Sequence, residues 1–371
     1  MSDTYPWEQY PLHELEEKGV ATLGRGNIIS KIDINNKPGG FPIYSSSAKG
    51  EGLFGTYGDY MFDEEMITWS VDGGGNLFYR PRHKFSVTNV SGYLKLDTSV
   101  LDYRFAHASL ALQHSKLTFD YQTKAHPSVI RKLYHLPLPP LPEQKKIAEI
   151  LSGIDNYIRL TTIQISKTEE LERGLLEEVF LAPDLSPSDG DALTVSELES
   201  DGLITLGRGN IISKQDIQRL PGGFPIYSSS GKGDGKFGEY GEHMFDEELI
   251  TWSIDGGGRL FHRKRHKFSV TNVCGYLRIN EPHLDYRYAH LALVFQHGRL
   301  RFDYSFKAHP SVIREIYRLP VPPLERQKEV ADIFDGIQRT RLALMEKNMQ
   351  LTNMKSAVAS DLLSGRKRVS V

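Results

Sequence analysis

The chain has 371 residues, of which 39% are hydrophobic and 25% charged, and its formal net charge is −2. These values are typical of globular domains, and the length allows two of ordinary size. No apolar run approaches the roughly 18 residues of a membrane span. The first residues lack the basic stretch and apolar core of a secretory signal. Neither a membrane span nor a secretory signal is therefore expected. The single cysteine, Cys274, excludes an internal disulfide and a cysteine-rich zinc site, and it fits a reducing cytoplasm.

The sequence contains an internal repeat of two similar copies. Residues 15–154 align with residues 198–337 at a constant offset of 183, without a gap. From residue 19 to residue 154, 91 of the 136 positions are identical in the second copy. A recent duplication leaves two copies similar under any selection, so this identity does not by itself mark function.

The first part of each copy, residues 12–135 and 195–318, is rich in Gly, Tyr, Phe, Ser and Thr. Short β-branched and aromatic runs between turn signals predict strands, and apolar residues at helical spacing predict one short helix. In the first copy we expect strands at 66–71, 84–90 and 92–96, a glycine turn at 72–75 and a helix over 102–114. The aromatic residues of these strands are expected in the core: Trp69, Tyr44 and Phe85, with Trp252, Tyr227 and Phe268.

The second part of each copy follows a proline-rich segment, residues 136–144 and 319–327. From Glu143 to about Leu181 apolar residues recur at steps of three and four, which predicts a long amphipathic helix, and residues 326–363 repeat the design. A helix of this length must bury its apolar stripe, and its twin is the natural partner. Antiparallel pairing is favoured because residues 182–193 form only a short, proline-containing linker.

The predicted fold class is therefore α+β: two similar mixed globules separated by two long helices in an antiparallel coiled coil, with approximate twofold symmetry. The predicted boundaries are 1–142 for the first globule, 143–181 for the central helix, 182–194 for the linker, 195–325 for the second globule, and 326–371 for the last helix and tail.

In each copy a globule leads through a proline-rich motif into a long helix. The two motifs are LPLPPLPEQKKIAEIL (136–151) and LPVPPLERQKEVADIF (319–334). This arrangement resembles the specificity subunit of type I restriction-modification systems. The openings GRGNIISKIDI and GRGNIISKQDI, each followed by FPIYSSS, are similar to the start of a target recognition domain of that family. The second entry motif departs from the first, with Arg326 in place of Glu143, while Gln144 and Gln327 match. That departure could alter contacts with partners without threatening the fold.

The resemblance implies a function without a catalytic centre in this chain. Each of two target recognition domains would read one half of an interrupted target in double-stranded DNA. The helices would dock methyltransferase (modification) subunits, which carry S-adenosylmethionine and methylate adenine. A restriction subunit, where one is present, would add the nuclease. No cofactor is expected on this chain itself, and no membrane partner.

Motifs of catalysis and metal binding are not found in the sequence. It has no Asn/Asp-Pro-Pro-aromatic motif, no GxxxxGK[ST] phosphate loop and no GxSxG serine. The histidines lack H-x₃-H and HExxH spacing and have no cysteine pairs beside them, which favours structural or surface roles over a metal site. These histidines are His83, His107 and His126, with His266, His290 and His309.

Basic and small polar residues at matched positions of the two copies are the candidates for DNA binding. The candidate phosphate contacts are Arg80, Arg82, Lys84, Arg259, Arg263, Lys264, Arg265 and Lys267 in or near the basic runs, with Lys31, Lys49, Lys124, Arg131, Lys214, Lys232, Lys307 and Arg314 elsewhere. The candidates for base edges are Arg25, Asn27, Ser45, Ser46 and Ser47, with Arg208, Asn210, Ser228, Ser229 and Ser230. We expect the small net charge to hide basic globules and an acidic helical spacer. Solvated loops remain the alternative for any single basic run.

Matching readers in opposite orientations require matching half-sites on opposite strands, so the target is expected to be an interrupted palindrome or near-palindrome. Positions at which the copies differ would make the halves unequal; these are Asn76/Arg259, Tyr79/His262, Pro81/Lys264, Leu53/Lys236 and Thr56/Glu239. Three alternatives stay open: the specificity subunit of a fused nuclease-methyltransferase (type IIB-like), a self-sufficient DNA-modifying enzyme, and a repeat scaffold that binds only proteins.

Overall fold

The computed structural model describes residues 7–46, 50–72, 74–117, 119, 124–182, 185–186, 192–229, 233–255, 257–280, 282–302 and 306–370. The chain divides into two compact units, Met1–Thr162 with Met345–Val371, and Ile163–Leu344. Each unit therefore combines the globule of one copy with part of both long helices.

The globule of unit 1 contains a six-stranded sheet, a separate two-stranded sheet and short helices. Its strands are β1 (Gln9–Pro11), β2 (Ala21–Arg25), β3 (Phe41–Tyr44), β4 (Leu53–Tyr57), β5 (Phe62–Ser70), β6 (Leu77–Val87), β7 (Ser91–Leu96) and β8 (His135–Pro137). Its helices are α1 (Leu12–Glu17), α2 (Lys31–Asn36), η1 (Gly50–Gly52), α3 (Tyr103–His114) and α4 (Pro127–Leu133). The sheet order is β2-β7-β5-β6-β3-β4, and β1 pairs with β8 separately. Only β3 and β6 run parallel among these described pairs.

Unit 2 repeats this plan. Its strands are β9 (Leu193–Thr194), β10 (Ile204–Arg208), β11 (Phe224–Tyr227), β12 (Lys236–Tyr240), β13 (Phe245–Ser253), β14 (Leu260–Val270), β15 (Cys274–Ile279) and β16 (Arg318–Leu319). Its helices are α6 (Val195–Ser200), α7 (Lys214–Arg219), α8 (Tyr286–His297) and α9 (Pro310–Ile316). The sheet order is β10-β15-β13-β14-β11-β12. The α+β class expected for both globules is confirmed.

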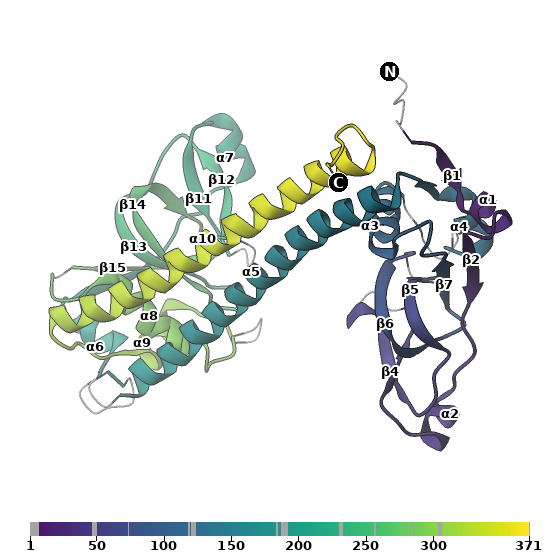
Figure 1. Ribbon diagram of the computed structural model, residues 1–371. Helices are drawn as coiled ribbons and strands as arrows, with labels where there is room; N and C mark the ends of the chain where they lie inside the picture. The colour runs from purple at the N-terminus through teal and green to yellow at the C-terminus, as the bar shows by residue number, and fades with distance from the viewer. Residues whose placement is uncertain are drawn as a thin grey trace. The chain divides into compact units, whose positions relative to one another are not determined.

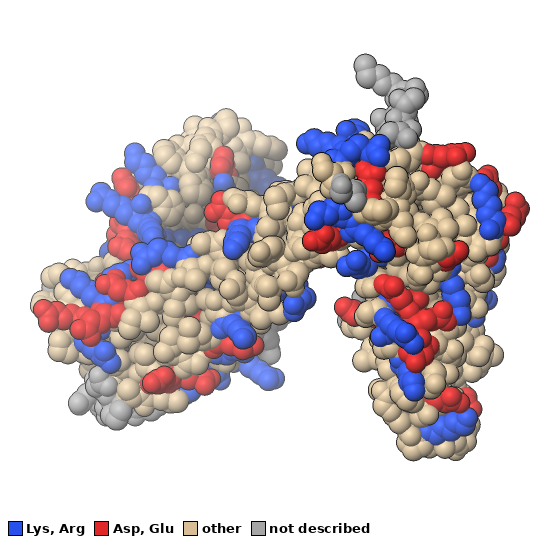
Figure 2. Space-filling view, in the orientation of Figure 1, with Lys and Arg blue, Asp and Glu red and all other residues tan. Residues whose placement is uncertain are grey.

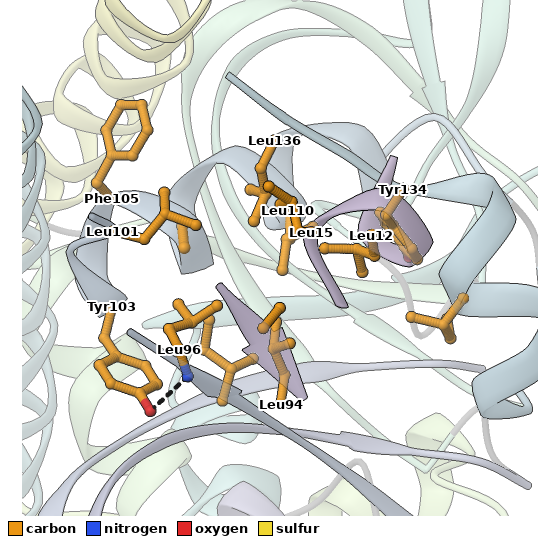
Figure 3. Packing of buried hydrophobic residues seen from close by; sticks show 14 of the residues in the cluster. Leu12, Leu15, Leu94, Leu96, Leu101, Tyr103, Phe105, Leu110, Tyr134 and Leu136 are labelled. Atoms are coloured by element: carbon orange, nitrogen blue, oxygen red, sulfur yellow. Dashed lines mark hydrogen bonds between the residues drawn. The ribbon is translucent and has the colours of Figure 1, made fainter. Parts of the chain in front are cut away.

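The main core of unit 1 lies between the sheet and helices α1, α3 and α4 (Figure 3). Trp69 on β5 is 1% exposed, and its indole N–H donates to the carbonyl of Ala125 at 2.7 Å. The hydroxyl of Tyr103 accepts a hydrogen bond from the backbone N–H of Leu96 at 2.8 Å, which ties α3 to β7. These two polar groups of the core thus have partners, as burial favours. The expected core positions of Trp69, Trp252, Phe85 and Phe268 are confirmed.

The long helices are α5 (Leu141–Leu181) and α10 (Leu324–Leu363). Both begin two residues before the predicted start. In α5 the first turn includes Pro142, which is tolerated there because the first backbone N–H groups of a helix have no partner within it. In unit 1 the start of α5 packs with the end of α10, and Leu151 joins a core with Leu362 (Figure 1, teal and yellow). In unit 2 the end of α5 and the start of α10 share the core. The predicted antiparallel pairing is thus present within each unit.

Ion pairs join the two helices within each unit. Lys355 contacts Asp155 at 2.5 Å in unit 1, and Arg341 contacts Glu172 at 2.8 Å in unit 2. Both helices carry charged residues along their exposed faces, and no helix of the described chain has the length and apolarity to cross a bilayer. Most of the predicted apolar stripe is buried or half-buried, although Leu171 is 54% exposed. The helices are thus amphipathic, as the sequence predicts.

One glutamine in each copy joins the long helix to its globule. The side-chain oxygen of Gln144 accepts from the N–H of Asp102 at 2.9 Å, and its amide nitrogen donates to the carbonyls of Val100 and Pro139. Gln327 makes the same three bonds in unit 2. Both side chains are at most 1% exposed. The glutamine that the two proline-rich motifs share is therefore a structural joint.

Glu143 precedes this joint, and its partner lies in the chain itself. The Arg368 guanidinium contacts both carboxylate oxygens of Glu143, at 2.6 and 2.7 Å, and the Glu143 side chain is 3% exposed. In unit 2 Arg326 takes this place and contacts Glu329 at 3.4 Å. The first motif thus carries a glutamate that binds the C-terminal tail, where the second motif carries an arginine.

The predicted linker is only partly described, because residues 183–184 and 187–191 lie outside the described residues. Leu185 and Ala192 are buried, at 0% and 3% exposure, and Leu185 belongs to the core of unit 2. The sequence predicts only a short, proline-containing linker here, and not the burial of these side chains. Leu185 and Ala192 pack onto the unit because burial favours apolar side chains over exposure to water.

Gly92 allows Trp69 to pack flat against β7. A Cβ at this position would lie 2.1 Å from two atoms of the indole ring, and these atoms belong to a rigid buried side chain. Gly92→Ala is expected to lower the free energy of unfolding by about 2 kcal/mol through overpacking. Denaturant unfolding of the full chain measures this change.

Gly40→Ala is the matched control, because a Cβ there meets nothing within 4 Å. Its unfolding midpoint should equal that of the parent. Equal midpoints for the two alanine variants would contradict the packing assigned to Trp69.

Candidate nucleic-acid interface

The turn between β6 and β7 brings three separate sequence motifs together in unit 1. The Arg25 guanidinium donates from Nε to the carbonyl of Asn89 at 2.9 Å. Asn27 forms an isolated β-bridge with Thr88, and the Thr88 hydroxyl donates to the hydroxyl of Ser45 at 2.9 Å. The predicted base-reading residues of GRGN and of the serine-rich motif therefore converge on one turn.

Unit 2 builds the same arrangement from the second copy. Arg208 donates to the carbonyl of Asn272 at 3.1 Å, Asn210 bridges to Thr271, and the Thr271 hydroxyl donates to Ser228 at 2.9 Å. We call these two sets the turn clusters: Arg25, Asn27, Ser45, Thr88 and Asn89 in unit 1, and Arg208, Asn210, Ser228, Thr271 and Asn272 in unit 2.

Lys124 lies beside the unit 1 turn cluster. The N–H of Val71 donates to the carbonyl of Val90 at 2.9 Å, and the N–H of Ala125 donates to the carbonyl of Val71 at 3.1 Å. Lys124 then contacts Asp72 at 2.8 Å, as Lys307 contacts Asp255 in unit 2. These lysines thus have equivalent ion pairs in the two units, and each has an acidic neighbour that offsets its charge.

The backbone around Arg25 leaves no room for a side chain at Gly26. A Cβ there would lie 2.0 Å from the carbonyl oxygen of Val87. Next to this contact is a hollow of about 490 Å³, whose lining includes Arg25, Asn27 and Tyr60. Close backbone packing thus holds the donors at the rim of a polar hollow.

Most predicted DNA-binding residues are exposed. The exposed ones are Arg25, Asn27, Lys31, Arg82, Lys84 and Lys124 in unit 1, and Arg208, Asn210, Lys214, Arg259, Lys264, Arg265, Lys267 and Lys307 in unit 2. The half-buried ones are Ser45, Ser46, Ser228 and Ser229. Ser47, Lys49, Ser230 and Lys232 lie outside the described residues.

Arg80 is buried instead, at 2% exposure, and Arg263 is its equivalent at 6%. The Arg80 guanidinium lies 3.6 Å from the centre of the Tyr44 ring and donates to the carbonyl of Glu51 at 2.6 Å. Burial lowers the pKa of this guanidinium from its ordinary value. We therefore assign both arginines a positioning role and correct the expectation that the whole basic run faces DNA.

The reason is a β-bulge. The pairing of β5 with β6 shifts between Glu64 and Met66, so Met66 stands opposite Arg80 while Glu64 stands opposite His83. A bulge breaks the alternation of side chains along a strand. Arg80 therefore turns inward although Arg82 and Lys84, which have the same parity in sequence, are exposed.

Arg131 also has internal partners. It forms an ion pair with Glu16 and donates to the carbonyl of Leu23 at 3.0 Å, which joins α4 to α1 and β2. Arg314 and Glu199 repeat the pair in unit 2. The Arg131 ion pair lowers the pKa of the Glu16 carboxyl against the opposing effect of its burial. These contacts favour a structural role for both arginines.

The globules are less basic than expected. Acidic and basic residues are nearly balanced in each copy, and the second long helix has no acidic excess. Arg82 lies 3.6 Å from Asp63, and Arg265 lies 3.6 Å from Asp246. On the face shown in Figure 2, blue and red side chains lie interspersed. The predicted separation of charge between basic globules and an acidic helical spacer is therefore wrong. The case for DNA binding depends instead on the geometry of the turn clusters.

Thr88 and Asn89 are members of the cluster that the sequence interpretation missed. A sequence signal for these two residues exists, because the motif HKFSVTNV that contains them occurs unchanged in both copies. The histidines have other roles: His126 caps the N-terminus of α4, and burial lowers the pKa of His290 to about 4. Within the described part of the chain, no group of three or more metal-binding side chains comes together.

The family model and similar known proteins indicate the same family. The model of the type I restriction modification DNA specificity domain matches twice, at residues 6–173 and 194–353. A Mycoplasma pneumoniae chain named as a type I specificity subunit is 25% identical over 86% of this chain and 87% of its own length. The specificity subunit of the type I restriction enzyme MpnII from the same organism is 33% identical over 39% of this chain and 44% of its own.

Solved structures share the fold. The type I restriction-modification S subunit of M. genitalium superimposes with a TM-score of 0.68 at 16% identity, covering 98% of this chain and 97% of that one. A chain from a structural study of assembly and conformational transition in the type I system gives 0.51 at 13% identity, covering 96% and 97%. With the family model matched in both copies, this chain belongs to the type I restriction-modification DNA specificity family, as a targeting subunit with two target recognition domains.

Proposed function

We propose that each globule reads one half of an interrupted, near-palindromic DNA target through its turn cluster. The observation that supports this most directly is the duplication of the cluster. Arg25, Asn27 and Ser45 recur as Arg208, Asn210 and Ser228, whose contacts with the turn are made to the equivalent residues of the second copy. Two equal readers in one chain fit two equal half-targets.

The chemistry of the cluster suits base edges. Arginine donates two bonds to guanine, and asparagine pairs with adenine in the major groove. Both Arg25 and Asn27 are exposed, and each is held at the turn by bonds that leave other polar atoms free to face solvent. Fixed donors of this kind discriminate bases because a wrong base leaves them unpaired.

Exposed basic residues outside the clusters are the proposed phosphate contacts. In this group are Lys31, Arg82, Lys84 and Lys124, with Lys214, Arg265, Lys267 and Lys307 as their counterparts. Their acidic neighbours limit the net field, so we expect modest non-specific affinity and a larger share of affinity from base contacts.

The long helices are the proposed docking site for methyltransferase subunits that carry S-adenosylmethionine. They expose apolar side chains in both units, among them Tyr157 at 62%, Leu342 at 56% and Met349 at 59%. Apolar residues gathered on one element mark protein interfaces more often than free surface. A restriction subunit would join in systems that include one.

The target itself provides the first test. When the chain is combined with its methyltransferase subunits, mapping of methylated bases by long-read sequencing should show two nearly inverted half-sites around a gap of fixed length. The matched clusters dictate that symmetry. Two unrelated half-sites would contradict the proposal, and the chain without its partners, which transfers no methyl group, is the control.

Arg25→Ala should weaken binding of the target by about 1–3 kcal/mol and relax specificity in one half-site only. The loss follows because a guanidinium held at a fixed place is removed from a base edge. Fluorescence anisotropy with duplexes mutated in either half measures the effect. Arg208→Ala is the matched variant and should relax the other half; relaxation of both halves by one variant would count against separate readers.

The helices are proposed to set the gap. Insertion of one heptad into both α5 and α10, after Thr162 and after Leu344, lengthens each helix by about 10 Å. The preferred gap should then grow by about three base pairs, at roughly 3.4 Å per pair, while the half-sites stay the same. Selection from duplexes with gaps of varied length gives the measurement.

The control for this insertion replaces the neighbouring native heptads with the same seven residues, so that composition changes and length does not. Its gap should equal that of the parent. An inserted chain that folds and still prefers the parental gap would refute the spacer role.

A further inference from the structure

Ile28 follows the turn cluster of unit 1 directly and is 79% exposed; Ile211 has the same place and exposure in unit 2. A large aliphatic side chain gains free energy when it leaves water, so such exposure has a cost in the free protein. Both isoleucines adjoin Asn27 or Asn210, which belong to the proposed reading surface. In a complex with DNA, both side chains would lie close to the bases that this surface reads.

The backbone on both sides of Ile28 is fixed. Asn27 bridges to Thr88, and Ser30 forms a capping box with Asp33, in which the N–H of Ser30 donates to the carboxylate at 2.8 Å. Hydrogen bonds from Ser30 hold the pKa of Asp33 below its usual value. The side chain therefore projects from a preorganised segment, and little conformational entropy remains to be lost on binding.

Comparison of the two copies separates Ile28 from other exposed apolar residues nearby. Ile32 is 69% exposed and is replaced by Gln215 in the second copy. Leu53 is 53% exposed and is replaced by Lys236. The second copy therefore carries polar side chains at both of these positions, whereas exposed isoleucines stand at position 28 and at its counterpart 211.

We propose that Ile28 and Ile211 are specificity-determining residues that contact the 5-methyl group of a thymine, one in each half-site. The methyl group is the apolar feature that base pairs present in the major groove. Ile28 lies beside Arg25 and Asn27, whose polar groups suit the neighbouring base edges. This inference rests on the proposed function and adds an apolar contact to its polar ones.

The test is a cycle that combines a protein variant with a base analogue. A target is first selected from a library of randomised duplexes with the full-length chain. Binding of Ile28→Ala and of the parent is then measured on this duplex and on duplexes in which single thymines are replaced by deoxyuridine, which lacks only the methyl group. Ile28→Ala should bind the target about tenfold more weakly than the parent, with an unchanged salt dependence.

At one thymine, deoxyuridine should weaken binding by the parent about fourfold and binding by Ile28→Ala hardly at all, because the contact is then already lost. Ile211→Ala should show the same coupling in the other half-site. Ile32→Gln is the control, since it copies a residue that the second globule carries, and it should bind like the parent.

Two failures are distinguishable. If the parent selects no target or loses no affinity when the target is mutated, the proposed function itself fails. If the parent discriminates but Ile28→Ala binds equally well, or shows the full deoxyuridine effect at every thymine, the isoleucine contact is overturned and half-site reading stands.

Discussion

The amide side chain of a single glutamine governs how each globule continues into its long helix. Gln144 and Gln327 each bond three backbone groups that belong to the end of the globule and to the proline-rich entry. A buried amide left with unmet partners would cost free energy, so the three bonds favour one entry geometry over others. The turn clusters can serve as fixed readers only if each globule is rigidly joined in this way to the helix that leaves it.

A second layer of buried contacts supports the turn clusters from inside. Arg80 packs on Tyr44 and holds the carbonyl of Glu51, and Trp69 bonds the carbonyl of Ala125 beside Lys124. Arg80 adjoins exposed Arg82 in the sequence, yet one positions the surface while the other forms part of it. One basic sequence run thus contains both exposed residues and a buried residue that packs beneath them.

The repeat, the three strands β5, β6 and β7, the short helix after Asp102 and the two long helices could be predicted from the sequence, because apolar periodicity and turn residues act locally. The other strands of the globule were not predicted. The burial of Arg80 could not, since it depends on a bulge that appears only when β5 and β6 pair. Thr88 and Asn89 were missed because their role comes from contacts with Arg25 and Ser45, which lie far away in sequence. The charge expectation failed because it counted basic runs without the acidic residues that pair with them, such as Asp63 and Asp72.

Each unit draws its helices from both copies: Leu151 of α5 shares a core with Leu362 of α10. In a chain reduced to one copy, part of the apolar stripe of the long helix would therefore be exposed to water. That stripe could be buried again only against the long helix of an identical chain. The duplicated polypeptide behaves as a dimer whose subunits are covalently tethered, and tethering replaces a concentration-dependent encounter by a constant effective concentration. Assembly of the reading pair is thereby independent of how much protein a cell contains, and the two halves are free to diverge, as Ile32 and Gln215 have done.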